Sequence, residues 1–581
     1  MPEPFGHVDA RRIAGVVASA LTWGDTCGTA VMLGLTTTQL EWLALAGAVL
    51  VAVTVPRWVQ RVASPLLRAF EQLGRRPLVA SLVFAAATFA GAFACAWLVQ
   101  WPMARVHDEY SYLLAADTFA AGRLCFPAPP CAEQLESFHV ITTPVYASKY
   151  PSGQGLALAL GQALGDPALG VWFSAALFVG ALAWMLLGFL PARWALLGAS
   201  VALLRYATTS YWAQSYWGGA LTAAGAALAF GALVRIWRRG SFALGAVLGL
   251  GVALLALTRP FEGAVACAPL AFALAWWSWR RAREAELGVV ARTFAGAAVP
   301  LAASLVWMAV LNRAITGDPL RMPYFLHDAQ YAVAPPFLWL EAAPAPHFAT
   351  REIGEFWTGF AYELWAQQQS FAGFLERAAI KLGAWWSYFI GAPLTLALLV
   401  APFALRGRWL RFGALVIASV AVGVLSVAYD LPHYLAPAAP WIVAVCVGGL
   451  RVLASVRPLR RARRGSAIVI AVLGVLSVEC VVRGALRERP EHSFERERAR
   501  IEEELTLVGR KAVVIVQYAE GHNVHDDWVF NRADLDAAHV IWARDHGEAA
   551  RERLRACFPE RSGYLLSVGR QGPAQRTALW P

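Results

Sequence analysis

LVASLVFAAATFAGAFACAWLVQ, at residues 78–100, is followed closely by HDEYSYLLAADTFAAGRL, at residues 107–124. The first stretch has no charged side chain, and at roughly 1.5 Å per residue it can cross a hydrocarbon core of about 30 Å as a helix. The second begins with acids and continues with apolar residues at helical spacing, up to Gly122 as a helix stop. Together they predict a membrane-spanning helix that leads into a short helix along the outer membrane surface.

Similar apolar runs recur along the chain of 581 residues, which is 58% hydrophobic and 15% charged, with a mean hydropathy of +0.49. One soluble core could not bury them all, so lipid is expected to surround most of them. We predict an α-helical polytopic membrane protein with about 13 transmembrane helices, or 12 if the first, which contains Asp25, is re-entrant. The predicted spans are residues 13–34, 39–55, 78–100, 168–190, 194–212, 217–235, 241–258, 260–279, 289–311, 382–403, 412–429, 436–455 and 466–483.

The formal net charge of +11 raises nucleic acid as a partner, but the arginines lie in short loops between the apolar runs. Such loops anchor membrane proteins on the cytoplasmic side. With a cytoplasmic N-terminus, every cluster falls on that side, and we expect membrane lipids and no nucleic acid as partners. The clusters are Arg57, Arg61, Arg68, Arg75 and Arg76; Arg235, Arg238 and Arg239; Arg280, Arg281 and Arg283; Arg406, Arg408 and Arg411; and the run from Arg457 to Arg464.

This topology divides the chain into three parts. Residues 1–77 are expected to form an N-terminal helical hairpin and a basic cytoplasmic loop, and residues 78–483 the main transmembrane domain, with outer loops at 101–167 and 312–381. Residues 484–581 are expected to form a small extracytoplasmic α/β domain. There, an amphipathic linker helix precedes the predicted strand AVVIVQY, and strands at 537–542 and 563–568 flank a helix at 548–556.

The first outer loop carries the residues best suited to chemistry. Asp108 and Glu109 begin its helix, and Lys149 follows in SKYPSGQG. One interpretation is structural: Asp108 caps the helix and Glu109 interacts with its positive end. The other is catalytic, because a carboxylate can take the proton of a hydroxyl that attacks a sugar carbon. A lysine, an arginine or a divalent metal ion can then stabilise the leaving phosphate.

In order and type these residues resemble the GT-C membrane glycosyltransferases, particularly aminoarabinose transferases and protein O-mannosyltransferases. Asp108 and Glu109, followed by Tyr112, match the acidic motif of the family's first outer loop, and Lys149 with Pro151 stands at its Lys-Pro segment. The stretches GLGVALLALTRP, LNRAITGDPLRMPY and PHYLAPAAP are similar to later loop edges. The last has histidine where arginine is usual, and the apolar segments near the N-terminus and the insertion CFPAPPC also depart from the family pattern.

The resemblance implies a GT-C-like fold and a glycosyltransferase of the cell envelope. Such an enzyme moves a sugar from a polyprenyl-phosphate donor to a lipid, glycan or protein acceptor on the outer face of a bacterial-type inner membrane. Asp108 would be the base or a metal-organising carboxylate, Glu109 its partner and Lys149 a phosphate contact. A divalent metal ion, held by Asp108 and Glu109, is the one cofactor considered.

Other outer edges supply further candidate site residues. Arg205 and Arg259 are candidate phosphate contacts. A charged side chain inside a span, such as Arg205, is energetically costly unless it is paired or faces water. The stretch SYWAQSYWGG offers aromatic rings that can stack on a sugar, although an interfacial aromatic belt is the alternative. Asp430 beside a span end is either a cavity residue or a helix cap. The candidate substrate contacts are Tyr112, Tyr150, Tyr211, Trp212, Gln214, Trp217 and His433.

Two short segments allow more than one interpretation. GHNVHDDW, with His522, His525, Asp526 and Asp527, is either a metal site or a polar surface loop. Cys125 and Cys131 can form a small disulfide if their loop faces an oxidising space.

Two other classes of function compete with the transferase. A transporter or flippase of lipid-linked or envelope substrates fits many helices and outward loops, although acids at the outer rim are not its signature. In a membrane assembly or sensor protein, the helices would anchor the C-terminal domain and the acids and lysine would be incidental.

Overall fold

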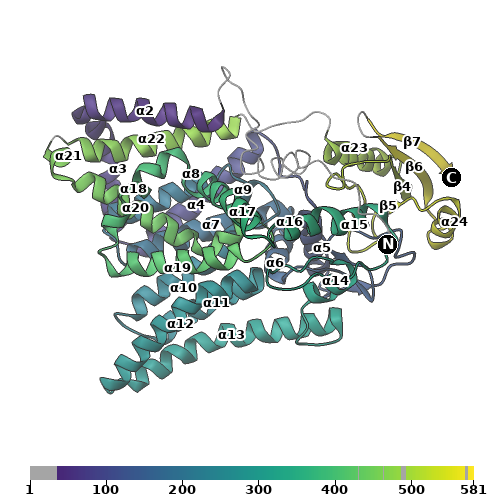
Figure 1. Ribbon diagram of the computed structural model, residues 1–581, viewed down its shortest axis with the longest axis horizontal. Coiled ribbons are helices and arrows are strands. Elements are labelled where there is room, and N and C mark those ends of the chain that lie inside the picture. The colour runs from purple at the N-terminus through teal and green to yellow at the C-terminus, as the bar shows by residue number, and fades with distance from the viewer. Residues whose placement is uncertain (1–35, 430, 462, 486–492, 570–572) are drawn as a thin grey trace.

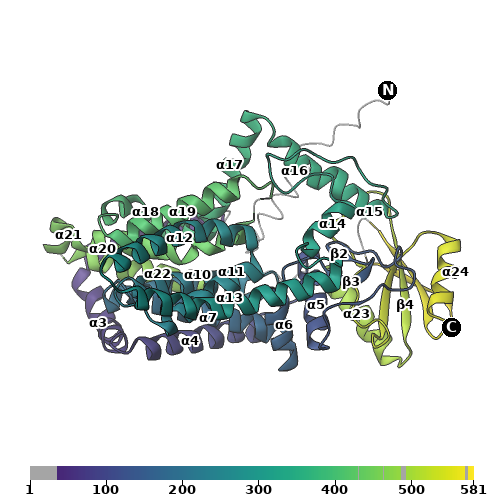
Figure 2. The same ribbon diagram turned by 90° about the horizontal axis from the view of Figure 1, so that it is seen from below.

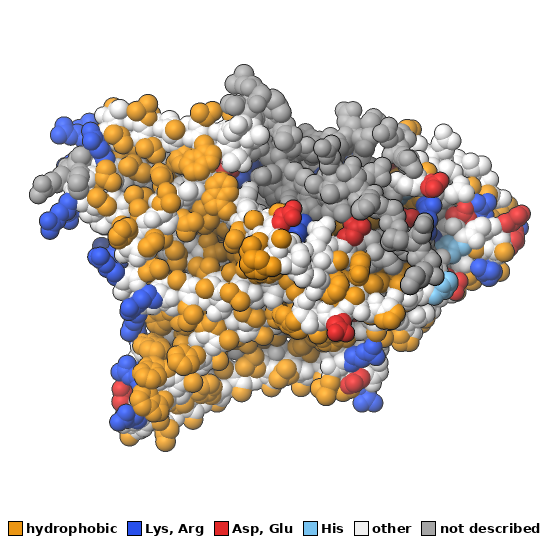
Figure 3. Space-filling view, in the orientation of Figure 1, with side chains coloured by type: hydrophobic (Ala, Val, Ile, Leu, Met, Phe, Trp, Pro, Cys, Tyr) orange, Lys and Arg blue, Asp and Glu red, His pale blue; other side chains and the backbone are white. Residues whose placement is uncertain are grey.

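The computed structural model describes residues 36–429, 431–461, 463–485, 493–569 and 573–581. A bundle of helices forms one end of the molecule and the C-terminal sheet the other (Figures 1 and 2). Between them lie the short helices α5 (His107–Ala120), α14 (Pro323–Tyr331) and α15 (Arg351–Glu355). The visible surface of the bundle is largely hydrophobic, and Lys and Arg side chains gather at its end farthest from the sheet (Figure 3). This distribution fits a multi-pass membrane protein with basic loops on one side.

Eight helical segments of the described residues are long and apolar enough to cross a membrane, or nine with the bent pair α2 (Thr37–Thr54) and α3 (Pro56–Leu73). The predicted count of 13 is therefore not confirmed, and the first predicted span lies outside the described residues. The eight are α4 (Pro77–Leu98), α7 (Pro167–Leu187), α12 (Pro260–Arg283), α13 (Leu287–Thr316), the series α17 (Phe371–Trp385), η2 (Trp386–Ile390) and α18 (Gly391–Ala404), then α19 (Arg408–Leu425), η3 (Pro432–Ala438) with α20 (Ala439–Ser455), and α22 (Arg464–Ala485).

Three predicted spans form shorter helices. α8 (Ala192–Arg205) has 14 residues, and α10 (Ala220–Ile236) and α11 (Phe242–Thr258) have 17 each. The aromatic stretch between α8 and α10 forms the small helix α9 (Tyr211–Gln214) and a turn. In that turn Gly218 and Gly219 adopt φ values of 95° and 109°, which glycine tolerates and other residues avoid. The apolar runs are thus longer than the helices that they form.

The predicted span at residues 39–55 corresponds to α2, and the predicted basic loop after it contains a second helix, α3. α2 and α3 meet at an angle of 102°, and Pro56 begins α3. Because proline has no backbone N–H, it cannot continue the hydrogen-bond ladder of α2. The basic segment is therefore helical, which was not predicted, and its place on the cytoplasmic side stays a prediction.

The segment predicted to be the first outer loop contains a helix at the predicted position, α5, which is followed by Gly122 with φ of 70°. Its N-cap is Val106, and the Glu109 carboxylate accepts the N–H groups of Arg105 (2.8 Å) and Val106 (3.2 Å). The prediction that Asp108 caps this helix was therefore wrong. The loop continues through a small sheet of order β1-β3-β2, comprising β1 (Phe126–Pro127), β3 (Val145–Ser148) and β2 (Val140–Ile141), to α6 (Ser152–Ala163).

The C-terminal domain is the predicted small α/β unit. Its sheet has the order β5-β4-β6-β7, in which β4 runs parallel to β5 and β6 and antiparallel β7 is added at the edge. The apolar segment AVVIVQY forms the central strand β4, as predicted, whereas β7 was not predicted. The elements are α23 (Phe494–Leu507), β4 (Ala512–Tyr518), β5 (Val540–Arg544), α24 (Glu548–Cys557), β6 (Ser562–Val568) and β7 (Gln575–Trp580).

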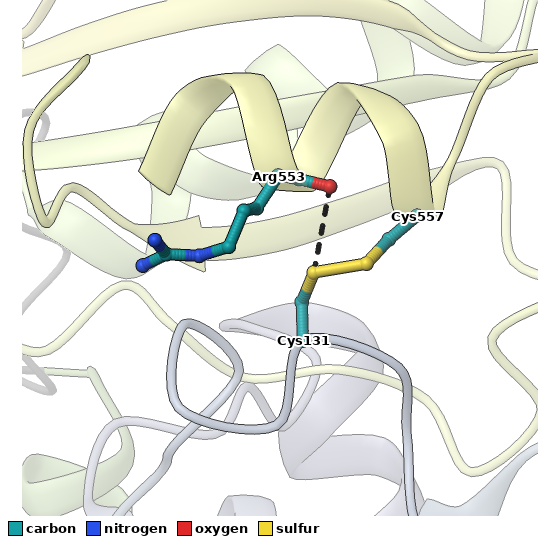
Figure 4. The surroundings of a disulfide bond; sticks show 3 residues. All are labelled: Cys131, Arg553 and Cys557. Carbon is teal, nitrogen blue, oxygen red and sulfur yellow. Dashed lines mark hydrogen bonds between the residues drawn. A yellow bond between two sulfur atoms is a disulfide. The ribbon is translucent and has the colours of Figure 1, made fainter. Parts of the chain in front are cut away.

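This domain packs firmly against the first outer loop. Leu135 of that loop belongs to the hydrophobic core of the sheet, and Arg532 pairs with Asp117 of α5 at 3.1 Å. Cys131 forms a disulfide with Cys557 of α24, with a Cα–Cα distance of 6.6 Å (Figure 4). The predicted pairing of Cys131 with Cys125 was therefore wrong, because packing places Cys131 against the domain and leaves Cys125 as a free thiol.

Candidate functional site

A cavity of about 300 Å³ lies where both outer loops, the C-terminal domain and the turn between α11 and α12 meet. This volume is at the lower end of the range of about 300 to 1,000 Å³ typical of small-ligand sites. Its wall is mainly aromatic and aliphatic, with a few charged and imidazole side chains. Six of the residues predicted from the sequence line it: Asp108, Tyr112, Lys149, Tyr150, Trp217 and Arg259.

Asp108 presents its carboxylate to this cavity from the first turn of α5, with 25% of the side chain exposed. The hydroxyl of Tyr150 donates a hydrogen bond to its Oδ1. Nε2 of His139 lies 4.0 Å from its Oδ2. Asp108 is therefore held in orientation while it stays open to a bound molecule, as a general base must be.

Glu109, the next residue, has a different environment. It is fully buried and does not line the cavity. Besides the N–H groups at the start of α5, its carboxylate accepts the backbone N–H of Tyr216 at 2.8 Å. Burial raises the pKa of Glu109 to about 7. Because neighbouring residues of a helix point about 100° apart, one acid faces the cavity while the other joins α5 to the segment before α10.

Lys149 reaches the cavity from the segment between β3 and α6, with only 3% of the residue exposed. Its Nζ lies over the rings of Tyr324 (4.7 Å), Trp357 (5.2 Å) and Tyr150 (5.4 Å). Burial lowers its pKa, and the carboxylates of Asp328 and Asp108 act in the opposite direction. Among the described residues no carboxylate forms a salt bridge with Lys149. A buried cation that lies against aromatic faces and has no salt bridge within the described part of the chain is well placed to receive an anionic ligand.

Arg259 supplies a second cation at the turn between α11 and α12. Its Nη1 lies 3.8 Å from Oε1 of Glu262, and its guanidinium lies 4.5 Å from the centre of the Tyr434 ring. The sequence Thr-Arg-Pro explains the position: proline begins α12, so the arginine before it occupies the break between two helices. The cavity wall therefore holds two cations and two carboxylates, of which Glu262 is paired with Arg259 and Asp108 is not.

The remaining predicted residues lie away from the cavity. Arg205 is buried in the bundle and pairs with Glu479 at 2.6 Å. Gln214 donates hydrogen bonds to two backbone carbonyl groups, and the side chain of Trp212 is buried among aromatic rings. Tyr211 and His433 form a layer behind Trp217, whose ring centre lies 5.0 Å from that of His433. Asp430 lies outside the described residues.

The described residues contain no group of three or more His, Cys, Asp or Glu side chains arranged to hold a metal ion. Asp108 and Glu109 do not form a joint site, since the oxygens of Glu109 face backbone N–H groups. In the tail, Asp527 pairs with buried Arg544 at 2.6 Å and His522 contacts the Asp526 carbonyl. The donor sets predicted for a metal therefore do not fit one among the described residues.

Several lining residues were not among the predicted site residues. His107, His139 and Phe356 come from the two outer loops, and His525 comes from the C-terminal domain. Tyr324 and Tyr434 lie in the stretches LNRAITGDPLRMPY and PHYLAPAAP, so their positions beside family-like loop edges were the available signal. His525 lies in GHNVHDDW, and no local pattern there indicates that the loop reaches a cavity formed by residues far away in the sequence.

No protein-family model matches the sequence, and no curated protein matches it. Among solved structures, ArnT from Cupriavidus metallidurans in the apo state aligns with 84% of this chain and 92% of its own, at 12% identity and a TM-score of 0.49. The Archaeoglobus fulgidus oligosaccharyltransferase aligns with 84% of this chain and 69% of its own, at 11% identity and a TM-score of 0.46. The arabinofuranosyltransferase AftD from Mycobacteria aligns with 84% of this chain and 35% of its own, at 17% identity and a TM-score of 0.43.

All three TM-scores lie below 0.5, and none of the three sequence identities exceeds 17%. Each of the three alignments covers 84% of this chain.

Proposed function

We propose that this protein is a glycosyltransferase that moves a sugar from a polyprenyl-phosphate donor to a hydroxyl group of a lipid, glycan or protein acceptor. One observation carries the proposal: Asp108, Lys149 and Arg259 line the same aromatic cavity at the edge of an apolar helix bundle. A carboxylate next to two cations suits a reaction in which a hydroxyl loses a proton and a phosphate becomes the leaving group.

In the proposed reaction, Asp108 takes the proton of the acceptor hydroxyl as its oxygen bonds to the anomeric carbon of the sugar. The bond between that carbon and the phosphate oxygen breaks, and the electron pair stays on the phosphate. Lys149 and Arg259 hold the resulting negative charge in a buried, low-dielectric environment where such contacts are strong. Tyr150 orients Asp108, and Glu109 is a positioning residue that fixes the start of α5.

We further propose that the cavity lies on the outer face of a bacterial-type inner membrane, with a cytoplasmic N-terminus. Two observations support this orientation. The basic side chains gather at the far end of the bundle, which is the cytoplasmic end in membrane proteins (Figure 3). The disulfide between Cys131 and Cys557 joins the loop that carries Asp108 and Lys149 to the C-terminal domain, and disulfides persist in oxidising compartments (Figure 4).

A transporter remains the alternative that an experiment has to separate from a transferase. The cavity is lined by outer-loop residues and by Arg259 at a helix break, whereas transporter sites lie near the bilayer midplane. The two functions also differ in their products: a transferase breaks the bond between sugar and lipid phosphate, and a transporter leaves it intact.

The test uses membranes that contain the protein and matched membranes that lack it. Both receive undecaprenyl phosphate linked to radiolabelled mannose, glucose, arabinose or aminoarabinose, together with an envelope extract as acceptor. The proposal predicts that the protein transfers label from at least one donor to acceptor material and releases undecaprenyl phosphate. Intact donor that has only changed leaflet would indicate transport and contradict the proposal.

A further inference from the structure

Three histidine side chains from separate parts of the chain surround one aromatic ring at the cavity. The ring of Phe356 lies 5.6 Å from that of His107, 5.8 Å from that of His139 and 5.9 Å from that of His525, measured between centroids. Phe356 belongs to the second outer loop, in η1 (Phe356–Phe360), and all four residues line the cavity. The arrangement therefore joins both outer loops and the C-terminal domain.

His525 is the contribution of the C-terminal domain. A hydrogen bond fixes its loop, because Nε2 of His107 lies 3.0 Å from the carbonyl oxygen of Val524. A carbonyl oxygen only accepts, so Nε2 of His107 donates and its Nδ1 is the accepting nitrogen of the ring. The His525 ring lies nearly parallel to that of His107 at 5.7 Å and contacts Phe360 edge-on at 4.7 Å. Its imidazole is thus placed at the cavity wall by contacts on two sides.

His139 connects this group to Asp108. It is buried and has a φ of 61°, a strained left-handed conformation for a residue other than glycine. Its Nδ1 is buried and makes no hydrogen bond with any of the described residues. Its Nε2 is the atom that lies 4.0 Å from Asp108. A buried polar atom without a partner is costly, and a bound ligand with hydroxyl groups would remove that cost.

The imidazole rings are neutral at pH 7. Burial lowers the pKa of His107 and His139 well below the ordinary value, and lowers that of His525 to about 4. A neutral imidazole offers one donor and one acceptor, which matches the hydroxyl groups of a sugar. The Phe356 face adds an apolar surface for the C–H groups of a sugar ring.

We propose that His107, His139, His525 and Phe356 form the subsite for the sugar ring of the donor, so that the C-terminal domain takes part in sugar recognition through His525. This inference rests on the proposed function. A sugar bonded to a phosphate at Lys149, with its anomeric carbon near Asp108, must lie against His139, since His139 is the imidazole adjacent to that acid. His107 and His525 extend the same wall.

The test compares two ligands on purified full-length protein: bare undecaprenyl phosphate, and undecaprenyl phosphate linked to mannose, glucose or arabinose. Wild type is expected to bind at least one sugar-bearing lipid more tightly than the bare lipid. His525→Ala should reduce that preference about tenfold, as expected for a lost hydrogen bond, and leave binding of the bare lipid unchanged. His525→Gln should retain part of the preference, because an amide also donates and accepts. His546→Ala, in the same domain but not at the cavity, is the matched control.

Each other outcome has a distinct meaning. If His525→Ala keeps the full preference, or if wild type prefers no sugar-bearing lipid, the subsite is wrong while the proposed function stands. If His525→Ala weakens the binding of the bare and the sugar-bearing lipid equally, its loop only maintains the shape of the cavity, and the role of His525 in sugar recognition is overturned. An intact disulfide between Cys131 and Cys557 in the variant shows that its C-terminal domain is still docked. If wild type does not bind even bare undecaprenyl phosphate, both the proposed function and the subsite fail.

Discussion

The hydroxyl of Tyr150 donates a hydrogen bond to the carboxylate of Asp108, and both side chains line the same cavity. The bond holds the proposed base at a fixed orientation from across the first outer loop. Tyr150→Phe is therefore expected to lower kcat about tenfold, the cost of one hydrogen bond of roughly 1.4 kcal/mol, with little change in donor KM. Steady-state transfer kinetics measure both values.

Tyr146→Phe is the matched control for that substitution. Tyr146 is also buried in this loop, but its hydroxyl contacts the carbonyl of Asn531 at 3.4 Å, away from the cavity. An equal fall in kcat in both variants would show that the effect comes from loop packing and would remove Tyr150 from the mechanism.

Lys149→Met is expected to weaken binding of undecaprenyl phosphate about 10- to 100-fold, because a contact between a charged donor and phosphate contributes roughly 1.5–3 kcal/mol. It should not lower the Tm, since the ammonium is buried and removing it removes a desolvation cost. Lipid-binding titration and thermal unfolding in detergent measure the two effects. Lys511→Met, in the C-terminal domain and away from the cavity, is the matched control and should leave the affinity for undecaprenyl phosphate unchanged. If Lys149→Met has a lower Tm but its folded fraction binds undecaprenyl phosphate with wild-type affinity, the proposed role of Lys149 is contradicted.

The helices of the bundle and α5 were predictable because their signals are local: apolar runs, helical spacing and helix stops. The position of α5 after α4 also placed Asp108 just beyond the end of a predicted span. The actual helix lengths were less predictable, because apolar residues continue into turns such as the one at Gly218 and Gly219. Hydropathy alone does not mark where such a run stops being helical.

The cavity was predictable only in part, because it is formed by contacts between distant segments. Asp108 and Lys149 could be assigned from one loop, but their neighbours Tyr324 and His525 lie far along the chain. Adjacent acids also look equivalent in sequence, whereas Glu109 packs against backbone N–H groups and Asp108 faces the cavity. The partner of Cys131 is 426 residues away and has no local signal.

The disulfide gives a prediction that can be checked by direct observation. Non-reducing digestion and mass spectrometry should yield a linked peptide that contains Cys131 and Cys557, with Cys125 recovered as an alkylated free cysteine. A peptide joining Cys125 to Cys131 would contradict the described docking of the C-terminal domain.

Stability should fall as the pH is lowered from about 6.5. The pKa values of His107, His139 and His525 are lowered by burial, so the folded protein keeps them neutral while the unfolded chain takes up protons below about 6.5. For His525, whose pKa is about 4, the loss at pH 5 is on the order of 2 kcal/mol. The Tm should therefore fall between pH 7.5 and pH 5, and it should fall less in His525→Gln. Equal falls in variant and wild type would argue against a buried neutral imidazole.

The most direct test of the central claim is transfer by purified Asp108→Asn at saturating donor, compared with wild type. Asparagine keeps the shape of the aspartate side chain and can still accept the hydrogen bond from Tyr150, but it cannot take a proton from the acceptor hydroxyl. We expect kcat to fall by about 10²- to 10⁴-fold, with undecaprenyl phosphate bound as in wild type. Transfer at the wild-type rate by this variant would contradict the account, because the cavity would then lack its base.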